Sequence, residues 1–345
     1  MSKATIDDVA RLAGVSIKTV SRVVNREQNV RESTRDRVQR AISELNYRPN
    51  LSARNLASLR SHLIVLVYDD PSAYEIPSGG YVIRMQQGVL RACGAADYEL
   101  LIHPCNYRNR NATDKLHALI DQVRPDGIVL AAPLSNMPRI VKAIADKGTP
   151  MVRLSPGKEN GGQFTVVTND REVCAEMTRY LVSLGHKRIA YVTGHPRHKA
   201  INNRFQGYKD GLKQSGLPFS EDLVIAGDNS FNSGEAGGDS LLSQENPPTA
   251  IFTANDDMAA GVIRAADRRG IDIPGQLSVA GFDDIALARQ IYPSLTTIRQ
   301  PLSQMAEVAA EALISDPGDG SKLKGTSVVP AQLMIRESTG PAPGD

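Results

Sequence analysis

The chain has 345 residues, of which 41% are hydrophobic and 23% are charged, and its formal net charge is +2. This composition is typical of a folded globular protein of two or three domains and excludes extensive disorder. Because the sequence contains no apolar run of about 18 residues, a membrane span is excluded. The first residues lack the apolar stretch of a secretory signal, and the three cysteines are widely spaced. We therefore expect a cytoplasmic protein without a disulfide framework.

The charge is distributed unevenly along the chain. Residues 1–60 contain 12 Lys+Arg and 6 Asp+Glu, a net charge of +6. Residues 61–345 contain 28 Lys+Arg and 32 Asp+Glu, a net charge of −4. A small basic head on a larger, mildly acidic body is typical of a polyanion-binding module attached to a second function, although a merely solvated basic segment remains the alternative.

The start of the head predicts two short helices joined by a tight turn. Thr5 is placed to cap the first helix, whose apolar positions recur at helical spacing: Ile6, Val9, Ala10 and Ala13. Gly14 suits the left-handed end of that helix, and Ser16 suits the start of the next one. Two helices joined in this way predict a helix-turn-helix.

The second helix leaves Ile17 and four polar or basic residues off its apolar side: Lys18, Ser21, Arg22 and Asn25. Such side chains suit a reader of the DNA major groove. A third helix is predicted from about Glu32 to Leu45. The alternative is an ordinary three-helix core with solvated arginines.

Two stretches of the head resemble the DNA-binding headpiece of the LacI/GalR family of transcription regulators: TIDDVARLAGVSIKTVSRVVN and STRDRVQRAISELNYRPNLSARNLAS. The resemblance implies a dimer on a pseudo-palindromic operator, with residues 1–48 as the headpiece. It implies base contacts by Ile17, Lys18 and Arg22. It also implies phosphate or positioning contacts by Thr5, Ser16, Thr19, Ser21, Asn25 and Thr34.

Residues 49–61 are expected to form a hinge or linker. The segment is too short for a helix that is stable alone, and the family resemblance implies that it folds on the operator. Leu56 would then insert into the minor groove, with Arg54 and Asn55 adding contacts beside it. A plain linker with an exposed leucine is the alternative.

From residue 62 the sequence alternates apolar strands with amphipathic helices. Strands are predicted at 62–68, 98–103, 127–132, 150–154, 188–193, 249–254 and 277–282. Helices are predicted near 82–94, 112–123, 136–147, 170–185, 199–215, 232–243, 256–269 and 301–315. This alternation predicts an α/β body of two doubly wound lobes, divided near 155–165, with ligands at the carboxyl ends of the strands.

The resemblance to the LacI/GalR family continues through the body in LVSLGHKRIAYVTG, NRFQGYKDGL, AIFTANDDMAAGVIRAADRRGIDIPGQLSVAGFDD and YPSLTTIRQP. It implies a periplasmic-binding-protein-like effector and dimerisation domain over 62–345. The N-lobe is expected at about 62–160 plus 295–325. The C-lobe is expected at about 163–292 plus 326–340, with a last strand near 327–335.

The same resemblance implies that Arg204, Asn255 and Asp283 contact effector hydroxyls, each just beyond a strand. Arginine offers a donor fork, aspartate accepts, and asparagine does both. The alternative is that Asp283 and Arg204 only cap helices or pair with each other. Further candidates for the effector site are Asp69, Tyr74, Ser155, Asn229 and Phe231. Asn229 and Leu302 depart from relatives that carry an aromatic residue there, which argues against transferring any relative's sugar specificity.

The Pro/Gly-rich segment 71–81 contains two tyrosines and is either a ligand-stacking loop or a surface loop. Enzymatic motifs are absent: there is no P-loop, dinucleotide fingerprint or GxSxG elbow. Ser155 and Lys158 match SxxK only by coincidence, and His195 and His198 lie in a Pro-containing loop unsuited to a metal.

The acidic pairs Asp256-Asp257 and Asp283-Asp284 are predicted to diverge rather than form dyads. Cys93 and Cys174 are predicted to be packing residues. We therefore expect no catalytic residue, metal or cofactor.

These features favour a repressor of carbohydrate-utilisation genes whose operator affinity is changed by a mono- or disaccharide or a sugar phosphate. The alternatives are a solute-binding protein and a sugar-processing enzyme with the same two-lobed fold. The residues after the body contain no apolar heptads, so a homodimer is expected rather than a tetramer held by a coiled coil.

Overall fold

The computed structural model describes residues 4–24, 29–47, 60–69, 79–157, 163–196, 199–316, 320 and 323–344. The chain divides into two compact units, residues 1–61 and residues 62–345. Each unit contains buried hydrophobic clusters of its own.

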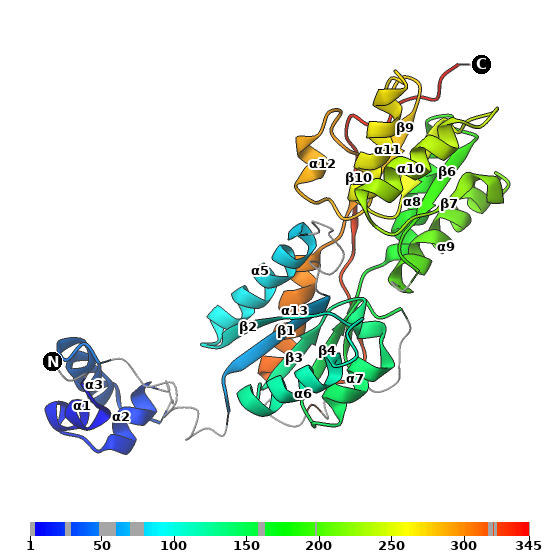
Figure 1. The fold of residues 1–345 in the computed structure, drawn as a ribbon. Coiled ribbons are helices and arrows are strands. Elements are labelled where there is room, and N and C mark those ends of the chain that lie inside the picture. The colour runs from blue at the N-terminus through cyan, green and yellow to red at the C-terminus, as the bar shows by residue number, and fades with distance from the viewer. Residues whose placement is uncertain are drawn as a thin grey trace. The chain divides into compact units, whose positions relative to one another are not determined.

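The first unit contains the helices α1 (Ile6–Ala13), α2 (Ile17–Val24) and α3 (Glu32–Glu44), drawn in blue in Figure 1. Thr5 caps α1 through a capping box with Asp8, which confirms the predicted N-cap. Gly14 ends α1 with φ 60°, a left-handed conformation that glycine adopts without strain. The amide of Thr19 donates to the Ser16 hydroxyl at 3.2 Å, so Ser16 caps the start of α2 as predicted.

Apolar residues at helical spacing hold these three helices together. The buried cluster consists of Val9, Ala10, Ala13, Val20, Val23, Val38 and Ala41. Because α2 buries Val20 and Val23, the remaining positions of this helix lie at or near the surface.

The N-lobe is built on a parallel six-stranded sheet in the order β11-β5-β4-β3-β1-β2. Its strands are β1 (Leu63–Asp69), β2 (Glu99–Cys105), β3 (Gly127–Leu130), β4 (Met151–Leu154), β5 (Thr165–Val167) and β11 (Thr326–Val328). Neighbouring residues of β1 point to opposite faces: Ile64 and Leu66 pack against α5 (Gly79–Ala95) and α13 (Leu302–Ser315). Val65 and Val67 pack toward α6 (Ala112–Val123) and α7 (Pro138–Ala145). A short 3₁₀ turn, η2 (Leu134–Asn136), precedes α7.

The C-lobe contains a parallel four-stranded sheet in the order β7-β6-β8-β9. Figure 1 labels β6, β7 and β9 of this sheet. Its strands are β6 (Ile189–Thr193), β7 (Val224–Ala226), β8 (Ala250–Thr253) and β9 (Ser278–Ala280). Its helices are α8 (Asp170–Ser183), α9 (Lys199–Gln214), α10 (Phe231–Leu242), α11 (Asp256–Arg268) and the short α12 (Leu287–Gln290), with η3 (Glu221–Leu223) before β7. Helix α8 packs against α9, and α10 packs against α11. The two doubly wound α/β lobes predicted from the alternating pattern are thus present.

The last crossings between the lobes differ from the expected boundaries. Strand β10 (Thr297–Arg299) was expected in the N-lobe, but it lies beside β9, because the amide of Gly281 donates to Thr296 and Ile298 packs in the C-lobe core. After β10 the chain therefore returns to the N-lobe at α13, not at residue 295 as expected. Strands β5 and β11 were both expected in the C-lobe. Both belong to the N-lobe sheet, because β5 pairs with β4 and β11 pairs with β5.

The predicted last strand near 327–335 is in fact two strands in different places. After β11, the chain returns to pair β12 (Gln332–Met334) antiparallel with β10. Only three residues separate the two strands, too few for the sequence pattern to divide them. Cys93 and Cys174 are buried, as expected for packing residues, and no helix in the part of the chain that is described is long and apolar enough to cross a membrane.

Candidate functional site

The head presents an accessible surface on α2. Ile17 is 47% exposed and Lys18 is also exposed, while Ser21 and Arg22 are half-buried. Thr34 lies in the first turn of α3. Asn25 and the hinge residues Arg54, Asn55 and Leu56 lie outside the described residues.

Three of the predicted phosphate contacts, Thr5, Ser16 and Thr19, also have structural roles. The Thr5 hydroxyl donates to Asp8 at 2.8 Å, and the Ser16 hydroxyl lies 2.9 Å from that of Thr19. These bonds hold the starts of α1 and α2.

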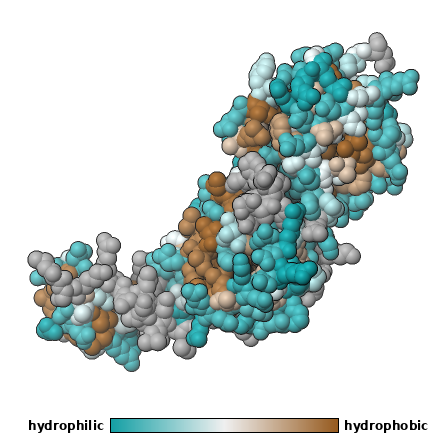
Figure 2. Space-filling model, in the orientation of Figure 1, coloured by the Kyte–Doolittle hydropathy of each residue, from teal (hydrophilic) through white to brown (hydrophobic). Residues whose placement is uncertain are grey.

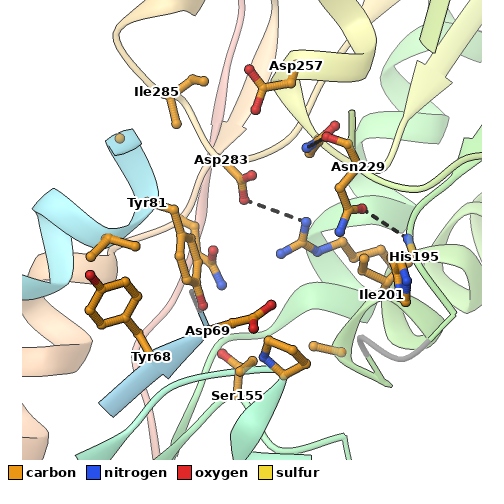
Figure 3. A pocket seen from close by; sticks show the side chains of 18 of the residues that line it. Tyr68, Asp69, Tyr81, Ser155, His195, Ile201, Asn229, Asp257, Asp283 and Ile285 are labelled. Carbon is orange, nitrogen blue, oxygen red and sulfur yellow. Dashed lines mark hydrogen bonds and ion pairs between the residues drawn. The ribbon is translucent and has the colours of Figure 1, made fainter. Parts of the chain in front are cut away.

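The body contains a pocket whose lining comes from both lobes (Figure 3). From the N-lobe it is lined by Tyr68, Asp69, Gly80, Tyr81, Val82, Tyr107, Ala132, Pro133 and Ser155. From the C-lobe and the crossing after β10 it is lined by His195, Ala200, Ile201, Arg204, Asp228, Asn229, Asn255, Asp257, Asp283, Ile285 and Gln300. Most of the polar members follow a strand, which is where a doubly wound sheet binds its ligands.

Arg204 is the buried cation of this pocket. Its Nε atom lies 3.4 Å from Asp170 Oδ2, and its Nη1 atom lies 3.6 Å from Asp283 Oδ1. Nη1 also donates to the carbonyl of Ala254 at 2.6 Å, and the guanidinium stacks on Phe282 at 3.5 Å from the ring centroid. Burial alone would lower the pKa of Arg204, but Asp283 and Asp170 outweigh this and raise it. The arginine is therefore held charged and in one orientation.

Asp283 faces Arg204 across the pocket (Figure 3). Burial raises the pKa of Asp283 to about 7, although the positive charge of Arg204 opposes this shift. Its backbone has φ 113°, an unfavourable conformation for a side chain with a Cβ. Its carbonyl accepts from Arg84 of α5 at 3.5 Å, which ties this turn to the N-lobe. Asp283 and Arg204 do pair with each other, and both also line the pocket.

Two asparagines shape the wall opposite the N-lobe. Asn255 caps α11 through its side-chain oxygen, which accepts from the amide of Met258 at 3.0 Å. Its Nδ2 donates to the carbonyl of Asn229 at 2.9 Å. The side-chain oxygen of Asn229 in turn accepts from the amide of His195 at 3.1 Å. These bonds fix the loops after β6 and β7, so both asparagines have structural roles as well as pocket positions.

Several buried polar atoms of the pocket have no hydrogen-bond partner among the described residues: Ser155 Oγ, Gln300 Oε1 and Asp283 Oδ1. Ser155 is 6% exposed and Gln300 is 1% exposed. Buried polar atoms are nearly always hydrogen-bonded in folded proteins, so these three atoms are suited to meet a bound molecule.

Six of the eight effector candidates predicted from the sequence line this pocket, Phe231 does not, and Tyr74 lies outside the described residues. Arg204, Asn255, Asp283, Asp69, Ser155 and Asn229 line it. Phe231 does not: it starts α10 with 40% exposure, because the loop before it directs Asn229 inward instead. Leu302 is buried in the N-lobe core between α13 and the sheet. Tyr74 lies outside the described residues, whereas Tyr81, the other tyrosine of the 71–81 segment, is on α5 and lines the pocket.

Sequence reasoning missed Tyr68, Tyr107, Asp257 and Gln300 as pocket residues. Each lies at or just after a strand, or in the first turn of a helix that follows one, and this position was the available signal. The acidic pairs diverge as predicted. Asp256 is buried and accepts from Thr297 and Ile285, while Asp257 faces the pocket. Asp284 is held by Arg299 at 2.7 Å and also by Arg289 and Arg336.

The donor set of the pocket suits a polar organic molecule rather than a metal. Across the described ranges, no three His, Cys, Asp or Glu side chains come together in a metal-binding group. An arginine fork, carboxylates, amides and three tyrosines instead match the hydroxyls and apolar face of a sugar-like ring.

Both structural units of the chain match known protein families. Residues 5–50 match the family described as bacterial regulatory proteins, lacI family, and residues 178–339 match the periplasmic binding protein-like domain. The chain is 34% identical over 342 residues to the HTH-type transcriptional regulator DegA of Bacillus subtilis (strain 168), covering 98% of this chain and 99% of that protein.

Two solved structures are similar over nearly the whole chain. One is the lac repressor dimer bound to operator and the anti-inducer ONPF, with TM-score 0.79, 26% identity and coverage of 98% of this chain and 100% of that one. The other is the complex of the transcriptional regulator CelR with cellobiose, with TM-score 0.73, 28% identity and coverage of 97% and 99%. The chain therefore belongs to the lacI family of DNA-binding transcriptional regulators, which are not enzymes, and it carries a helix-turn-helix head and a periplasmic-binding-protein-like effector domain.

Proposed function

We propose that this regulator is a cytoplasmic repressor of carbohydrate-utilisation genes, and that a small sugar-like effector in the body pocket changes its affinity for operator DNA. The observation that carries the proposal is the pocket itself. Arg204 and Asp283 face each other between the lobes, beside the buried atoms Ser155 Oγ and Gln300 Oε1, which have no hydrogen-bond partner among the described residues. CelR, which is similar over 97% of this chain, has been solved in complex with cellobiose.

The proposed coupling between pocket and DNA needs a difference in affinity. An effector changes operator binding only if it binds the DNA-competent and DNA-incompetent forms unequally. The pocket is lined by both lobes, and the hydrogen bond from Arg84 to the Asp283 turn also joins them. A ligand that draws these groups together would favour one relative position of the lobes.

The DNA side of the proposal assigns base contacts to Ile17, Lys18 and Arg22, and positioning contacts to Thr5, Ser16, Thr19, Ser21, Asn25 and Thr34. The exposure of Ile17 and Lys18 on α2 supports this assignment. The hinge proposal, in which Leu56 enters the minor groove beside Arg54 and Asn55, rests on the family resemblance.

We also propose that the regulator acts as a homodimer. An apolar surface, made of Ile83 and Leu90 on α5 and Ile102 on the edge strand β2, supports this. The three side chains are 52%, 54% and 39% exposed, and Figure 2 shows the apolar area on this part of the N-lobe. The two residues of α5 lie seven positions apart, on one face of the helix. A solved relative, the lac repressor, is a dimer on its operator.

The test of the DNA assignment is Arg22→Ala on an operator selected by the full chain from randomised DNA. Loss of a base contact should cost about 1–3 kcal/mol on the operator and relax discrimination at one base pair per half-site. Arg40→Ala, which removes an equal charge from exposed α3, is the matched control and should affect operator and random DNA alike. An equal loss on both DNAs for Arg22→Ala would contradict base reading.

A further inference from the structure

We propose that the pocket selects an effector rich in hydroxyl or amino donors and rejects any sugar that carries a phosphate or carboxylate. This inference rests on the proposed function, and it narrows the effector from sugars and sugar phosphates to neutral and amino sugars. It follows from the charge, the unpaired atoms and the helix end that line the pocket.

The pocket wall is acidic. Its lining contains four aspartates, Asp69, Asp228, Asp257 and Asp283, against Arg204 and His195. Asp170 lies behind Arg204 at 3.4 Å and adds a further carboxylate. Burial raises the pKa of Asp257 to about 6 and that of Asp283 to about 7, so both carboxyls are ionised above about pH 7. At such a pH an anionic group entering this lining would meet like charges in a partly buried setting, where repulsion is weakly screened.

Arg204 is poorly placed to offset an anionic ligand. Its guanidinium already faces two carboxylates, Asp170 and Asp283, and donates to the carbonyl of Ala254. A phosphate site needs a cationic fork that is available for bidentate contact. Here the positive charge is already balanced by the protein, so an added anion would have to displace one of these carboxylates.

Buried polar atoms of the lining favour hydrogen-bond donors on the ligand. Among the described residues, Gln300 Oε1 and Ser155 Oγ have no hydrogen-bond partner, and Asp283 Oδ1 has only its ion pair with Arg204 at 3.6 Å. The Gln300 oxygen and the ionised Asp283 oxygen accept, and the Ser155 hydroxyl both accepts and donates. Ser155 and Gln300 are more than nine-tenths buried, so leaving them unpaired is costly. Hydroxyl and ammonium groups supply the missing hydrogens, whereas the oxygens of phosphate and carboxylate only accept.

Acidic side chains already lie at the helix N-terminus that borders the pocket. The N-terminus of α11, which begins after the capping residue Asn255, would ordinarily attract an anion. Asp256 and Asp257 already fill its first turn, and Asp257 lines the pocket. The tyrosines Tyr68, Tyr81 and Tyr107 complete the lining with aromatic faces suited to a sugar ring.

The experiment uses the full chain and matched sets of ligands that share one ring. Each set contains a neutral sugar, its amino sugar, its uronate and its phosphate ester, for glucose, galactose and ribose or the nearest available analogue. Cellobiose is added as a neutral disaccharide. Binding is detected as a rise in Tm and quantified by calorimetry. We expect a neutral or amino member to bind at least about tenfold more tightly than its acidic counterparts.

A variant that removes one negative charge tests whether the acidic wall causes the weaker binding of acidic sugars. Asp257→Asn keeps the shape of the wall and should narrow the gap between neutral and acidic members, whereas Glu176→Gln, on the exposed side of α8, should leave it unchanged. An acidic member that binds as tightly as its neutral counterpart, or the absence of binding by every neutral and amino member, would overturn the inference. The proposed regulatory function fails in a different way: a sugar of the set would bind the protein but leave its affinity for operator DNA unchanged.

Discussion

Asp283 connects the chemistry of the pocket with its pH response. Its carboxylate lies 3.6 Å from Arg204, and one of its oxygens has no hydrogen-bond partner among the described residues. The charged groups that act on it are Arg204, Asp257, Asp170 and Arg84, and the phenol of Tyr81 is affected by it in turn. Burial is the largest influence, and it raises the pKa of Asp283 to about 7. Near neutral pH this carboxyl is therefore protonated in only part of the molecules.

Effector affinity should consequently rise with pH. A ligand hydroxyl that donates to Asp283 favours the ionised carboxylate, so its affinity is full above pH 7 and is lost as the pH falls through the raised pKa. Between about pH 6 and about pH 8 the affinity should rise about tenfold, with release of a proton. Calorimetry in two buffers of different ionisation enthalpy measures both effects. Asp283→Asn should bind more weakly and without this pH dependence, and a variant that kept it would assign the proton to another group.

At this scale the sequence predicted several residues that line the pocket. Asn255 and Asp283 lie within three residues of a strand end, as expected, whereas Arg204 lies in the middle of α9 rather than just beyond a strand. Arg204, Asn255 and Asp283 lie in long stretches that resemble one family, and their neighbours made them recognisable. Gln300 could not be predicted, because it follows the three-residue strand β10, whose apolar signal is only Ile298. Phe231 was predicted wrongly, because two residues of loop decide which side chain turns inward, and that geometry is set by the hydrogen bond between Asn229 and His195.

Helix α5 illustrates how one element supports both the core and the surface of the N-lobe. Its inward residues Val82, Met85 and Val89 pack into the core, and its outward residues Ile83 and Leu90 are exposed. At Gly88 the helix comes so close to α13 that an added Cβ would overlap the carbonyl of Ser303. At Gly94 of the same helix, nothing lies within 4 Å of an added Cβ.

Gly88→Ala should therefore destabilise the body, and Gly94→Ala should not. Forcing α5 away from α13 should cost about 1–3 kcal/mol, more than the gain of about 1 kcal/mol from the better helix propensity of alanine. Only the propensity gain applies to Gly94→Ala. Urea unfolding of both variants measures the difference. Equal free energies of unfolding would mean that the two helices pack less closely than described.

At the scale of elements, the sequence predicted the long helices and the central strands, because their periodicity extends over many residues. Helices α6 and α11 begin at the predicted residues, 112 and 256. The short strands β5, β7, β10, β11 and β12 were missed or misplaced, because three residues carry no measurable alternation. Their positions depend on pairing with a strand distant in sequence, as β11 does with β5.

On the scale of the whole molecule, the net charge of +2 combines a basic head and an acidic body. The head carries +6 and the body −4, and the acidic pocket contributes to the latter. In a homodimer the head charge acts twice on one DNA, so operator affinity should fall steeply with salt.

The dimer itself can be tested at α5. Leu90→Glu places a charge in the exposed apolar surface of Ile83, Leu90 and Ile102 and should convert the dimer to a monomer. Phe231→Glu, an equal change at an exposed aromatic residue of α10, is the control and should remain dimeric. Light scattering after size-exclusion chromatography gives the mass of each. A Leu90→Glu protein that stays dimeric at the same concentration would place the interface elsewhere.

The most direct test of the central claim is a titration of operator affinity against a pocket ligand. The operator is the DNA selected by the full chain, the ligand is the sugar that raises the Tm most, and anisotropy of labelled DNA reports binding. A ligand-coupled regulator predicts that the saturating sugar changes the operator Kd of the wild type by about 5–150-fold, and changes that of Asp283→Asn far less at the same sugar concentration. An operator Kd that stays the same with and without saturating sugar in the wild type would contradict the account.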